Sequence, residues 1–387
     1  MKQVIDFKRL PDRFRSFAAR VIPVLILLHT YIGWQLLPVM PLPSYSMPLG
    51  IILLASSCFL TPLGLFARFV VVDEDLADRT SLVGYIAMGL FSSLLILTAL
   101  RNLLLLFVSD TSTQSTSALM VVAITLFVSL IGFVNARKIA RVKHVTIRLD
   151  KLPAALHGFR IVQLSDIHVG STIKSAYVKA IVERVNLLTP DQIAITGDIV
   201  DGSVARLGIH TAHLGQLQSR HGTYLVTGNH EYYSGAEEWI TEFNRLGIKC
   251  LINEHAVINH EGARLLVAGV TDFTAHQFIP AHRSDPEQAI ANSPSGLVSI
   301  LLAHQPRSAA AAEKAGFHLQ LSGHTHGGQF WPWNLFVPMQ QPFVAGLNRL
   351  GKMWVYTSRG TGYWGPPKRF GAQSEITLIT LVGKPGS

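Results

Sequence analysis

The sequence contains few charged residues, and the places where charge is missing are informative. Asp, Glu, Lys and Arg make up 15% of its 387 residues, whereas a soluble domain carries about a quarter. None of the four occurs in residues 21–67, 81–100 or 111–136. A chain that is soluble throughout is therefore excluded, and so is a single cleaved signal peptide, because these runs are too long and too many. We predict a membrane domain over residues 1–143 and a soluble domain over residues 144–387.

Cysteine is also scarce. The two cysteines, Cys58 and Cys250, fall in different predicted domains. A disulfide framework within the soluble domain is therefore excluded, which fits a reducing compartment. The net charge of +9 comes partly from Arg and Lys near the ends of the apolar runs. We therefore expect no nucleic-acid partner, and we expect the lipid bilayer to be the partner of this basic rim.

The apolar runs predict about four transmembrane helices, because a spanning helix needs roughly 20 apolar residues. Their approximate limits are 19–39, 48–70, 81–103 and 116–136. Arg101 interrupts the third run. Either that helix ends near Arg101 and the following residues lie in the membrane interface, or the arginine side chain snorkels to the interface.

Lys and Arg at the ends of the runs predict the orientation. Basic residues cluster before the first run and after the last, and the first loop has none. Since basic residues favour the cytoplasmic side, both termini should lie there. We therefore predict a multi-pass protein of the cell (inner) membrane with its soluble domain in the cytoplasm. The two clusters are Lys2, Lys8, Arg9, Arg13, Arg15 and Arg20, and then Arg137, Lys138, Arg141 and Lys143.

Seven side chains of the kinds that bind metals occur in five short motifs of the second half. Each motif follows an apolar run that is typical of a buried strand. Strands of one sheet bring their ends to one edge, so the five loops can converge on one site. Oxygen and imidazole ligands without thiolate suit Mn²⁺ best, with Fe, Zn or Mg as alternatives. The residues are Asp166 and His168 in LSDIHVG, Asp198 in ITGDIVD, Asn229 in VTGNHE, His304 in LLAHQP, and His324 and His326 in LSGHTHGG.

This run of motifs resembles the calcineurin-like metallophosphoesterases, and GHTHGGQ with the tail SRGTGYWGPPKRFGAQSEI is most similar to their membrane-associated bacterial branch. The resemblance covers about residues 145–387. It implies an α/β fold, with two β-sheets flanked by helices in an α/β/β/α sandwich. The alternation of predicted strands, helices and hairpins agrees with that fold.

The resemblance also implies a role for each motif residue. Asp198 would bridge two divalent metal ions. Asp166, His168 and His326 would complete the first metal site, and Asn229, His304 and His324 the second. His230, which follows Asn229, would stabilise the phosphoryl group or protonate the leaving oxygen, and Glu231 would orient His230.

These features favour a membrane-anchored phosphohydrolase in which water activated between two metals attacks a phosphodiester or pyrophosphate. A lipid-linked substrate is one candidate, and a soluble nucleotide is the alternative. A membrane sensor or scaffold with a phosphoesterase fold is the non-enzyme alternative.

Two further groups of residues remain open. Trp331, Trp333 and Phe336 belong to the core, line a groove for an acyl chain, or dip into the membrane. Arg359 and Arg369 clamp a phosphate, or they are ordinary surface or ion-pair residues.

Overall fold

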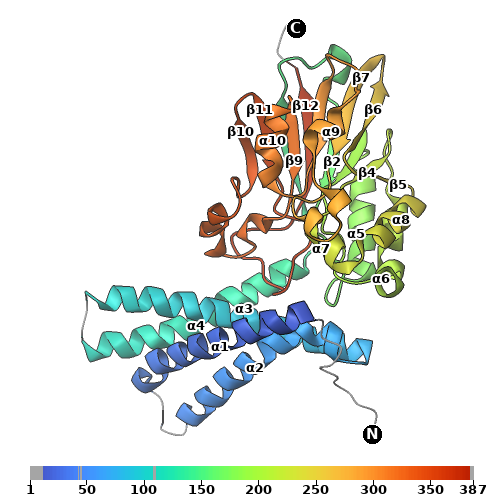
Figure 1. The fold of residues 1–387 in the computed structure, drawn as a ribbon. Coiled ribbons are helices and arrows are strands. Elements are labelled where there is room, and N and C mark those ends of the chain that lie inside the picture. The colour runs from blue at the N-terminus through green and yellow to red at the C-terminus, as the bar shows by residue number, and fades with distance from the viewer. Residues whose placement is uncertain (1–11, 42, 44–45, 108–109, 384–387) are drawn as a thin grey trace. The chain divides into compact units, whose positions relative to one another are not determined.

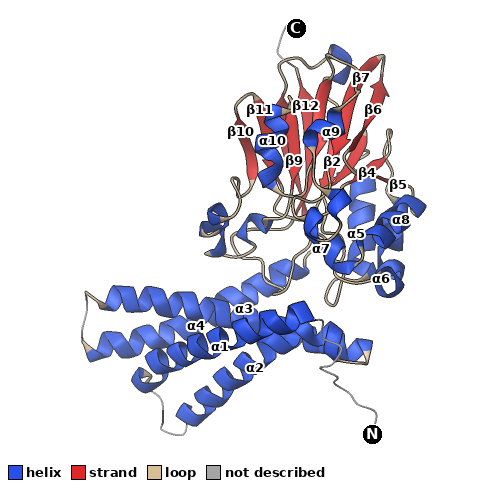
Figure 2. Cartoon of the chain, in the orientation of Figure 1, coloured by secondary structure: helices blue, strands red, loops and turns tan. Residues whose placement is uncertain are grey.

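The computed structural model describes residues 12–41, 43, 46–107 and 110–383 and divides into two compact units. The helical unit contains the residues up to Arg137 together with the segment Gly365–Phe370. The second unit contains Lys138–Trp364 and the residues from Gly371 onward. Figures 1 and 2 show the elements of each unit. Lys2, Lys8 and Arg9, which contribute to the orientation prediction, lie outside the described residues.

Four long helices form the first unit, and all four are long and apolar enough to cross a membrane. Many of their apolar side chains face outward, and Leu53, for example, is 62% exposed, as expected of a surface that contacts hydrocarbon. Helices α2 and α3 touch backbone to backbone, because a Cβ added at Gly64 would lie 2.6 Å from the Cα of Gly84. Small residues commonly permit this approach in membrane helices. The helices are α1 (Asp12–Leu36), α2 (Ser46–Val70), α3 (Glu74–Leu105) and α4 (Thr111–Arg137).

Arg101 is buried within the helical unit, in the last turns of α3. Helix α3 continues for a full turn beyond it, to Leu105. The side chain is buried. Its Nε donates a hydrogen bond to Ser117 Oγ at 2.9 Å, and its Nη2 donates to the Gln114 carbonyl at 2.8 Å. These acceptors at the start of α4 satisfy the guanidinium, which removes the need for it to reach water.

The second unit is a sandwich of two six-stranded sheets with helices, so the predicted α/β two-sheet fold is confirmed (Figure 2). The strands are rich in Ile, Val and Leu, which suits burial in a sheet. The first sheet has the order β1 (Arg141–Arg148), β12 (Glu375–Val382), β2 (Arg160–Leu164), β3 (Gln192–Ile195), β4 (Thr223–Leu225) and β5 (Ile248–Cys250). The second has the order β10 (Gly346–Leu350), β11 (Met353–Thr357), β9 (Leu319–Ser322), β8 (Val298–Leu302), β7 (Ala263–Gly269) and β6 (Glu254–His260).

One apolar core lies between the two sheets, and another lies under two short helices. Ile161 of β2 and Ile300 of β8 belong to the first core. Ala289 and Ala312, from α9 and α10, pack on β7, β8 and β11 in the second. The helices of this unit are α5 (Ser175–Asn186), α6 (Val204–Thr211), α7 (Asn229–Ser234), α8 (Ala236–Arg245), α9 (Pro286–Ile290) and α10 (Ala309–Lys314).

The five motif loops come from both sheets, rather than from one sheet as the sequence analysis assumed. Strands β2, β3 and β4 run parallel in the first sheet, and β8 and β9 run parallel in the second. Each motif follows the carboxyl end of one of these strands. The sandwich therefore supplies three loops from one sheet and two from the other.

Candidate metal centre

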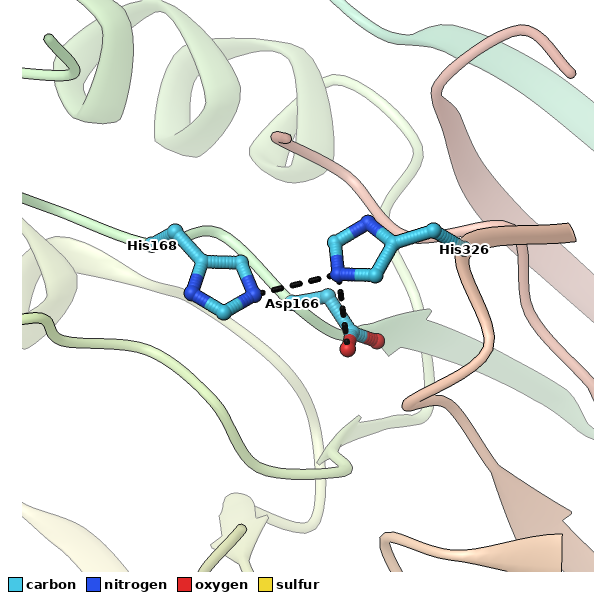
Figure 3. Close-up of side chains that lie close together, drawn as sticks. All are labelled: Asp166, His168 and His326. Atoms are coloured by element: carbon cyan, nitrogen blue, oxygen red, sulfur yellow. Dashed lines mark hydrogen bonds and ion pairs between the residues drawn. The ribbon is translucent and has the colours of Figure 1, made fainter. Parts of the chain in front are cut away.

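Asp166, His168 and His326 form the first cluster of the site (Figure 3). Their ligand-type atoms all lie within 4.8 Å of one another, and all three residues are buried. The Nε2 atoms of His168 and His326 are 3.1 Å apart. His326 Nε2 lies 3.5 Å from Asp166 Oδ1. Two imidazole nitrogens and one carboxylate that face each other in this way form a donor set suited to a divalent cation.

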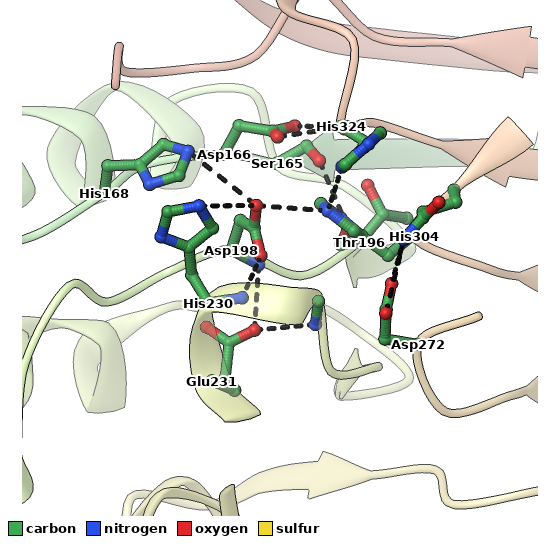
Figure 4. A network of polar contacts seen from close by, with 12 residues as sticks. Ser165, Asp166, His168, Thr196, Asp198, His230, Glu231, Asp272, His304 and His324 are labelled. Atoms are coloured by element: carbon green, nitrogen blue, oxygen red, sulfur yellow. Dashed lines mark hydrogen bonds and ion pairs between the residues drawn. The ribbon is translucent and has the colours of Figure 1, made fainter. Parts of the chain in front are cut away.

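Asp198, His304 and His324 form the second cluster (Figure 4). His304 Nε2 lies 3.1 Å from Asp198 Oδ2. His324 Nδ1 lies 3.2 Å from the same nitrogen of His304. His304 follows β8, whereas Asp198 follows β3, so the second cluster joins the two sheets.

A single oxygen of Asp198 faces both clusters. Its Oδ2 is 3.1 Å from His304 Nε2 in the second cluster and 3.9 Å from His168 Nε2 in the first. The same oxygen is 3.9 Å from His230 Nε2. A carboxylate in this position can serve two cations at once. His168, Asp198 and His230 are themselves close enough together to hold a cation.

Asn229 has a buried side-chain oxygen without a hydrogen-bond partner. The residue is buried as the first residue of α7, and its Oδ1 has no hydrogen-bond partner. Leaving such an acceptor unpaired costs about 1–3 kcal/mol. An amide oxygen is an acceptable ligand for a hard divalent cation, and it adds no charge. Six of the predicted residues therefore lie in clusters that could hold a cation, and Asn229 fits such a centre by its chemistry.

Five of the seven residues adopt left-handed backbone conformations. Such conformations cost of order 1–3 kcal/mol each for residues other than glycine and cluster at functional sites. Neighbouring glycines make room for them. A Cβ at Gly228 would collide with the Asp198 carboxylate, and one at Gly323 would collide with that of Asp166. The φ angles are 52° for Asp166, 56° for His168, 54° for Asp198, 68° for His324 and 52° for His326.

Hydrogen bonds on the far side of two imidazoles orient them towards the centre. His168 Nδ1 lies 3.1 Å from Asp201 Oδ1, and His304 Nδ1 lies 2.7 Å from the carbonyl of Thr196. Each Nδ1 therefore donates to an oxygen, and each Nε2 keeps its lone pair for the cluster. The carboxylate of Asp166 is held in turn by the backbone N–H of His324, at 3.0 and 3.1 Å.

Asp201, rather than Glu231, holds His230. The Nδ1 of His230 lies 2.6 Å from Asp201 Oδ1. Glu231 accepts hydrogen bonds from the backbone N–H groups of Asp198 at 2.9 Å and Gly228 at 2.6 Å. It therefore joins the β3 and β4 loops, and the prediction that it orients His230 is wrong. The second acid of the G-D-x-x-D motif was the available signal for Asp201.

The ionisable groups of the site shift one another's pKa values. Burial alone would raise the pKa of Asp198, but the His304 and His230 imidazoles hold that pKa well below its usual range. Burial alone would lower the pKa of His230, yet the Asp198 and Asp201 carboxylates raise it to about 9. Burial raises the pKa of Glu231 to about 7. Such a concentration of perturbed acids and bases is typical of functional sites.

The aromatic segment after His326 is exposed, so the interpretation that it belongs to the core is wrong. Trp331 and Phe336 are each 44% exposed, and Trp333 is 38% exposed. The segment folds back towards the site, because a Cβ at Gly328 would collide with the backbone of Asn334. An apolar surface therefore begins within a few residues of a predicted ligand.

The two arginines differ in exposure. Arg359 is partly exposed, and its Nη1 lies 3.4 Å from Glu375 Oε2. It is thus an ion-pair residue that keeps some exposed surface. Arg369 is fully buried, which argues against a role in clamping a phosphate.

Known proteins identify the family. The family model described as calcineurin-like phosphoesterase matches residues 159–328, which include all seven predicted ligands. A "Transmembrane protein with metallophosphoesterase domain" from Danio rerio is 40% identical over 266 residues. That match covers 67% of this chain and 61% of the relative, so the chain spans about three fifths of that protein. The resemblance is therefore not confined to bacteria.

The match to a second relative extends over enough of that protein to establish the family. An "Uncharacterized metallophosphoesterase" from Helicobacter pylori strain J99 is 38% identical over 258 residues, covering 65% of this chain and 67% of the relative. Among solved structures, a 5'-nucleotidase precursor from Thermus thermophilus shares 14% identity at a TM-score of 0.38, over 57% of this chain and 54% of that chain. That score is too low to bear on function. The sequence matches, together with the ligand-type residues at the strand ends, show that the chain belongs to the calcineurin-like phosphoesterase family.

Proposed function

We propose that the protein is a membrane-anchored phosphohydrolase that uses two divalent metal ions to cleave a phosphodiester or pyrophosphate. The observation that carries this proposal is the position of Asp198 Oδ2, which faces imidazole nitrogens of both clusters. Asp166, His168 and His326 would hold one ion, and Asn229, His304 and His324 the other. Two cations held there would supply positive charge to the phosphoryl oxygens and would lower the pKa of bound water.

His230 is the proposed proton donor. Asp201 fixes its Nδ1, so its Nε2 is the atom turned towards Asp198 and the two clusters. A proton on that nitrogen can pass to the leaving oxygen of the ester. Because Asp201 also contacts His168, one carboxylate sets the orientation of both a predicted ligand and the predicted acid.

A lipid-linked phosphoester is the substrate class that the protein's features favour. Four candidate membrane helices support a location in the bilayer, where an anchored substrate shares the same plane and meets the enzyme more often. The exposed Trp331, Trp333 and Phe336 offer an apolar surface near His326. We assign the catalytic domain to the cytoplasmic side of the cell membrane because of the flanking basic clusters.

Two alternatives would leave different signatures. A soluble-nucleotide phosphodiesterase would show no preference for acylated substrates. A sensor or scaffold would hydrolyse nothing, although the complete set of seven ligand-type residues and His230 argues against it.

The test is metal-dependent turnover of the full chain in detergent micelles. The protein is stripped with a chelator, and Mn²⁺, Fe²⁺, Zn²⁺ or Mg²⁺ is then added separately. Substrates are a phosphomonoester, a chromogenic diester and a lipid pyrophosphate. We expect activity to vanish on chelation and to return best with Mn²⁺, because the ligand set is made of oxygen and imidazole. Full activity in protein that elemental analysis shows to be metal-free would refute the proposal.

A further inference from the structure

Arg307 lies on the loop that carries His304, three residues further along the chain. This loop follows β8, which runs parallel to both β7 and β9, so the loops after these three strands lie at the same edge of the second sheet. His304 and His324 of the second cluster come from the loops after β8 and β9. Arg307 therefore lies at the edge of the sheet where the second cluster is formed.

Two neighbouring loops hold the Arg307 side chain, although the residue is exposed. Its Nε donates a hydrogen bond to the carbonyl of Gln340 at 2.7 Å. Its guanidinium carbon lies 5.8 Å from the centroid of the Phe273 ring, a contact that contributes about 0.5–1 kcal/mol at an exposed site. Among the residues that the structure describes, none accepts a hydrogen bond from the Nη groups of Arg307 or forms an ion pair with it. The side chain is thus held in place while most of its donors remain open to a ligand.

A buried polar network fixes the backbone of the same loop. The fully buried carboxylate of Asp272 accepts a hydrogen bond from Gln305 Nε2 at 2.9 Å. Gln305 Oε1 accepts from Gln341 Nε2 at 3.1 Å, and Gln341 Oε1 accepts from the backbone N–H of Arg307 at 3.3 Å. A satisfied network of this kind is rigid, because breaking any one bond leaves a buried polar group unpaired. Since Asp272 precedes Phe273, the network joins the loops that hold the Arg307 side chain.

The charge of Arg307 acts on the second cluster. Burial and the His304 imidazole lower the pKa of His324 to about 3, and the Arg307 guanidinium acts in the same direction. Two cations in the proposed centre would repel this guanidinium unless an anion lay between them. A planar guanidinium also matches the geometry of a phosphate, which it can bind through two parallel hydrogen bonds. The position and the chemistry of Arg307 therefore suit an anionic group that extends from the centre.

We propose that Arg307 binds the second phosphate of a pyrophosphate substrate while the first phosphate lies on the two cations. This inference rests on the proposed function, and it narrows the substrate class of that site from phosphodiesters or pyrophosphates to pyrophosphates. A simple phosphodiester has a single phosphate and leaves the Arg307 guanidinium without an anion. Arg307 is therefore a specificity-determining residue.

The first test compares two substrates on the metal-loaded full chain in micelles. CDP-diacylglycerol is the pyrophosphate, and bis(p-nitrophenyl) phosphate is the diester. Arg307→Gln should lower kcat/KM for the pyrophosphate by about 10–100-fold, the effect expected when a hydrogen bond to a charged group is lost. It should change kcat/KM for the diester by less than about twofold. Arg307→Lys keeps the charge without the planar fork and should recover part of the loss.

Arg349→Gln is the matched control, because the Arg349 side chain has the same two kinds of contact elsewhere. Its Nε donates to the Gly351 carbonyl at 3.2 Å, and its guanidinium carbon lies 5.2 Å from the centroid of the Trp354 ring. Trp354 pairs with Leu319 at the start of β9, at the end of the sheet opposite the site. The control should leave both substrates unaffected. Equal losses for both substrates in Arg307→Gln, or wild-type values for both, would overturn the proposal.

Ligand binding gives a readout that does not depend on hydrolysis. AMP and adenosine 5'-(α,β-methylene)diphosphate differ by one phosphate-like group, and the methylene bridge of the second resists hydrolysis. In isothermal titration of the Mn²⁺-loaded protein, the wild type should bind the diphosphate analogue more tightly than AMP, and Arg307→Gln should remove most of that preference. If the wild type hydrolyses none of the esters while the preference depends on Arg307, the proposed function fails and the second-phosphate site stands. An unchanged preference in Arg307→Gln would refute the site, whatever the activity of the enzyme.

Discussion

Asp198 is the residue whose carboxylate faces both clusters. Asp198→Asn keeps the size of the side chain but removes the negative charge that faces His168 and His304. We expect hydrolysis to fall to background and metal content to drop, while circular dichroism shows a folded protein. Asp150→Asn, at an exposed position, is the control. Wild-type rates with full metal content in Asp198→Asn would show that the site is assigned wrongly.

The variants His230→Ala and Asp201→Asn should lose activity in different ways. We expect His230→Ala to keep both metals and to lose rate by roughly 10²–10⁴, the usual contribution of an acid–base group. Asp201→Asn removes the negative charge of the carboxylate that accepts from both His230 and His168. It should therefore slow turnover and also weaken metal binding by about 10–100-fold, as loss of a supporting carboxylate does. Metal titration followed by kinetics distinguishes the two variants, and early loss of metal from His230→Ala would make His230 a ligand.

The ligand-type residues could be predicted from sequence because each follows a strand, and strand ends converge. The residues that orient them could not be predicted as well. His304 is oriented by the backbone carbonyl of Thr196. Because every residue has a backbone carbonyl, the sequence does not indicate which one accepts this hydrogen bond. Asp201 was visible as the second acid of its motif, but the roles of Asp201 and Glu231 follow from side-chain directions, which spacing does not specify.

At the scale of elements, the aromatic segment after His326 should determine substrate preference. Trp333→Ala removes a partly exposed ring that is in contact with Phe336. If this surface binds an acyl chain, the variant should slow a lipid-linked substrate at least about tenfold more than a small chromogenic diester, because binding energy from the remote chain is lost only for the former. Leu187→Ala, at another exposed apolar position, is the control. Equal slowing of both substrates would remove the support for a lipid-linked ester.

Two element-scale features depend on partners that are distant in the sequence. Arg101 remains inside α3 because Gln114 and Ser117 of another helix accept its hydrogen bonds. Similarly, β8 pairs with β7 and β9 rather than with β2–β4. Local hydrophobic periodicity predicts that a segment is a strand or a helix. It does not predict which other segments that strand or helix joins.

At the scale of the whole molecule, the sequence predicted a membrane part followed by a catalytic part, but not the return of Gly365–Phe370 to the helices. The segment GPPKRF has the composition of an ordinary loop. Its assignment depends on Gly89 and Gly132, which are more than 200 residues away in the chain. A glycine within a helix lowers stability by about 1 kcal/mol relative to alanine. The reason for a glycine at position 132 becomes clear only in the structure, where Lys368 lies against it.

Membrane orientation is the last prediction. Six basic residues precede residue 21 and four lie within residues 137–143, whereas the first loop has none. Basic residues resist translocation, so both clusters should remain in the cytoplasm, and that requires an even number of spans. A green fluorescent protein fused after Ser387 should fluoresce, and an alkaline phosphatase fused there should be inactive. Fusion of the same two reporters after Pro41, in the first loop, should give the opposite result. Active phosphatase after Ser387 would place the catalytic unit outside the cytoplasm, and its phosphoester substrate would then have to be available on that side of the membrane.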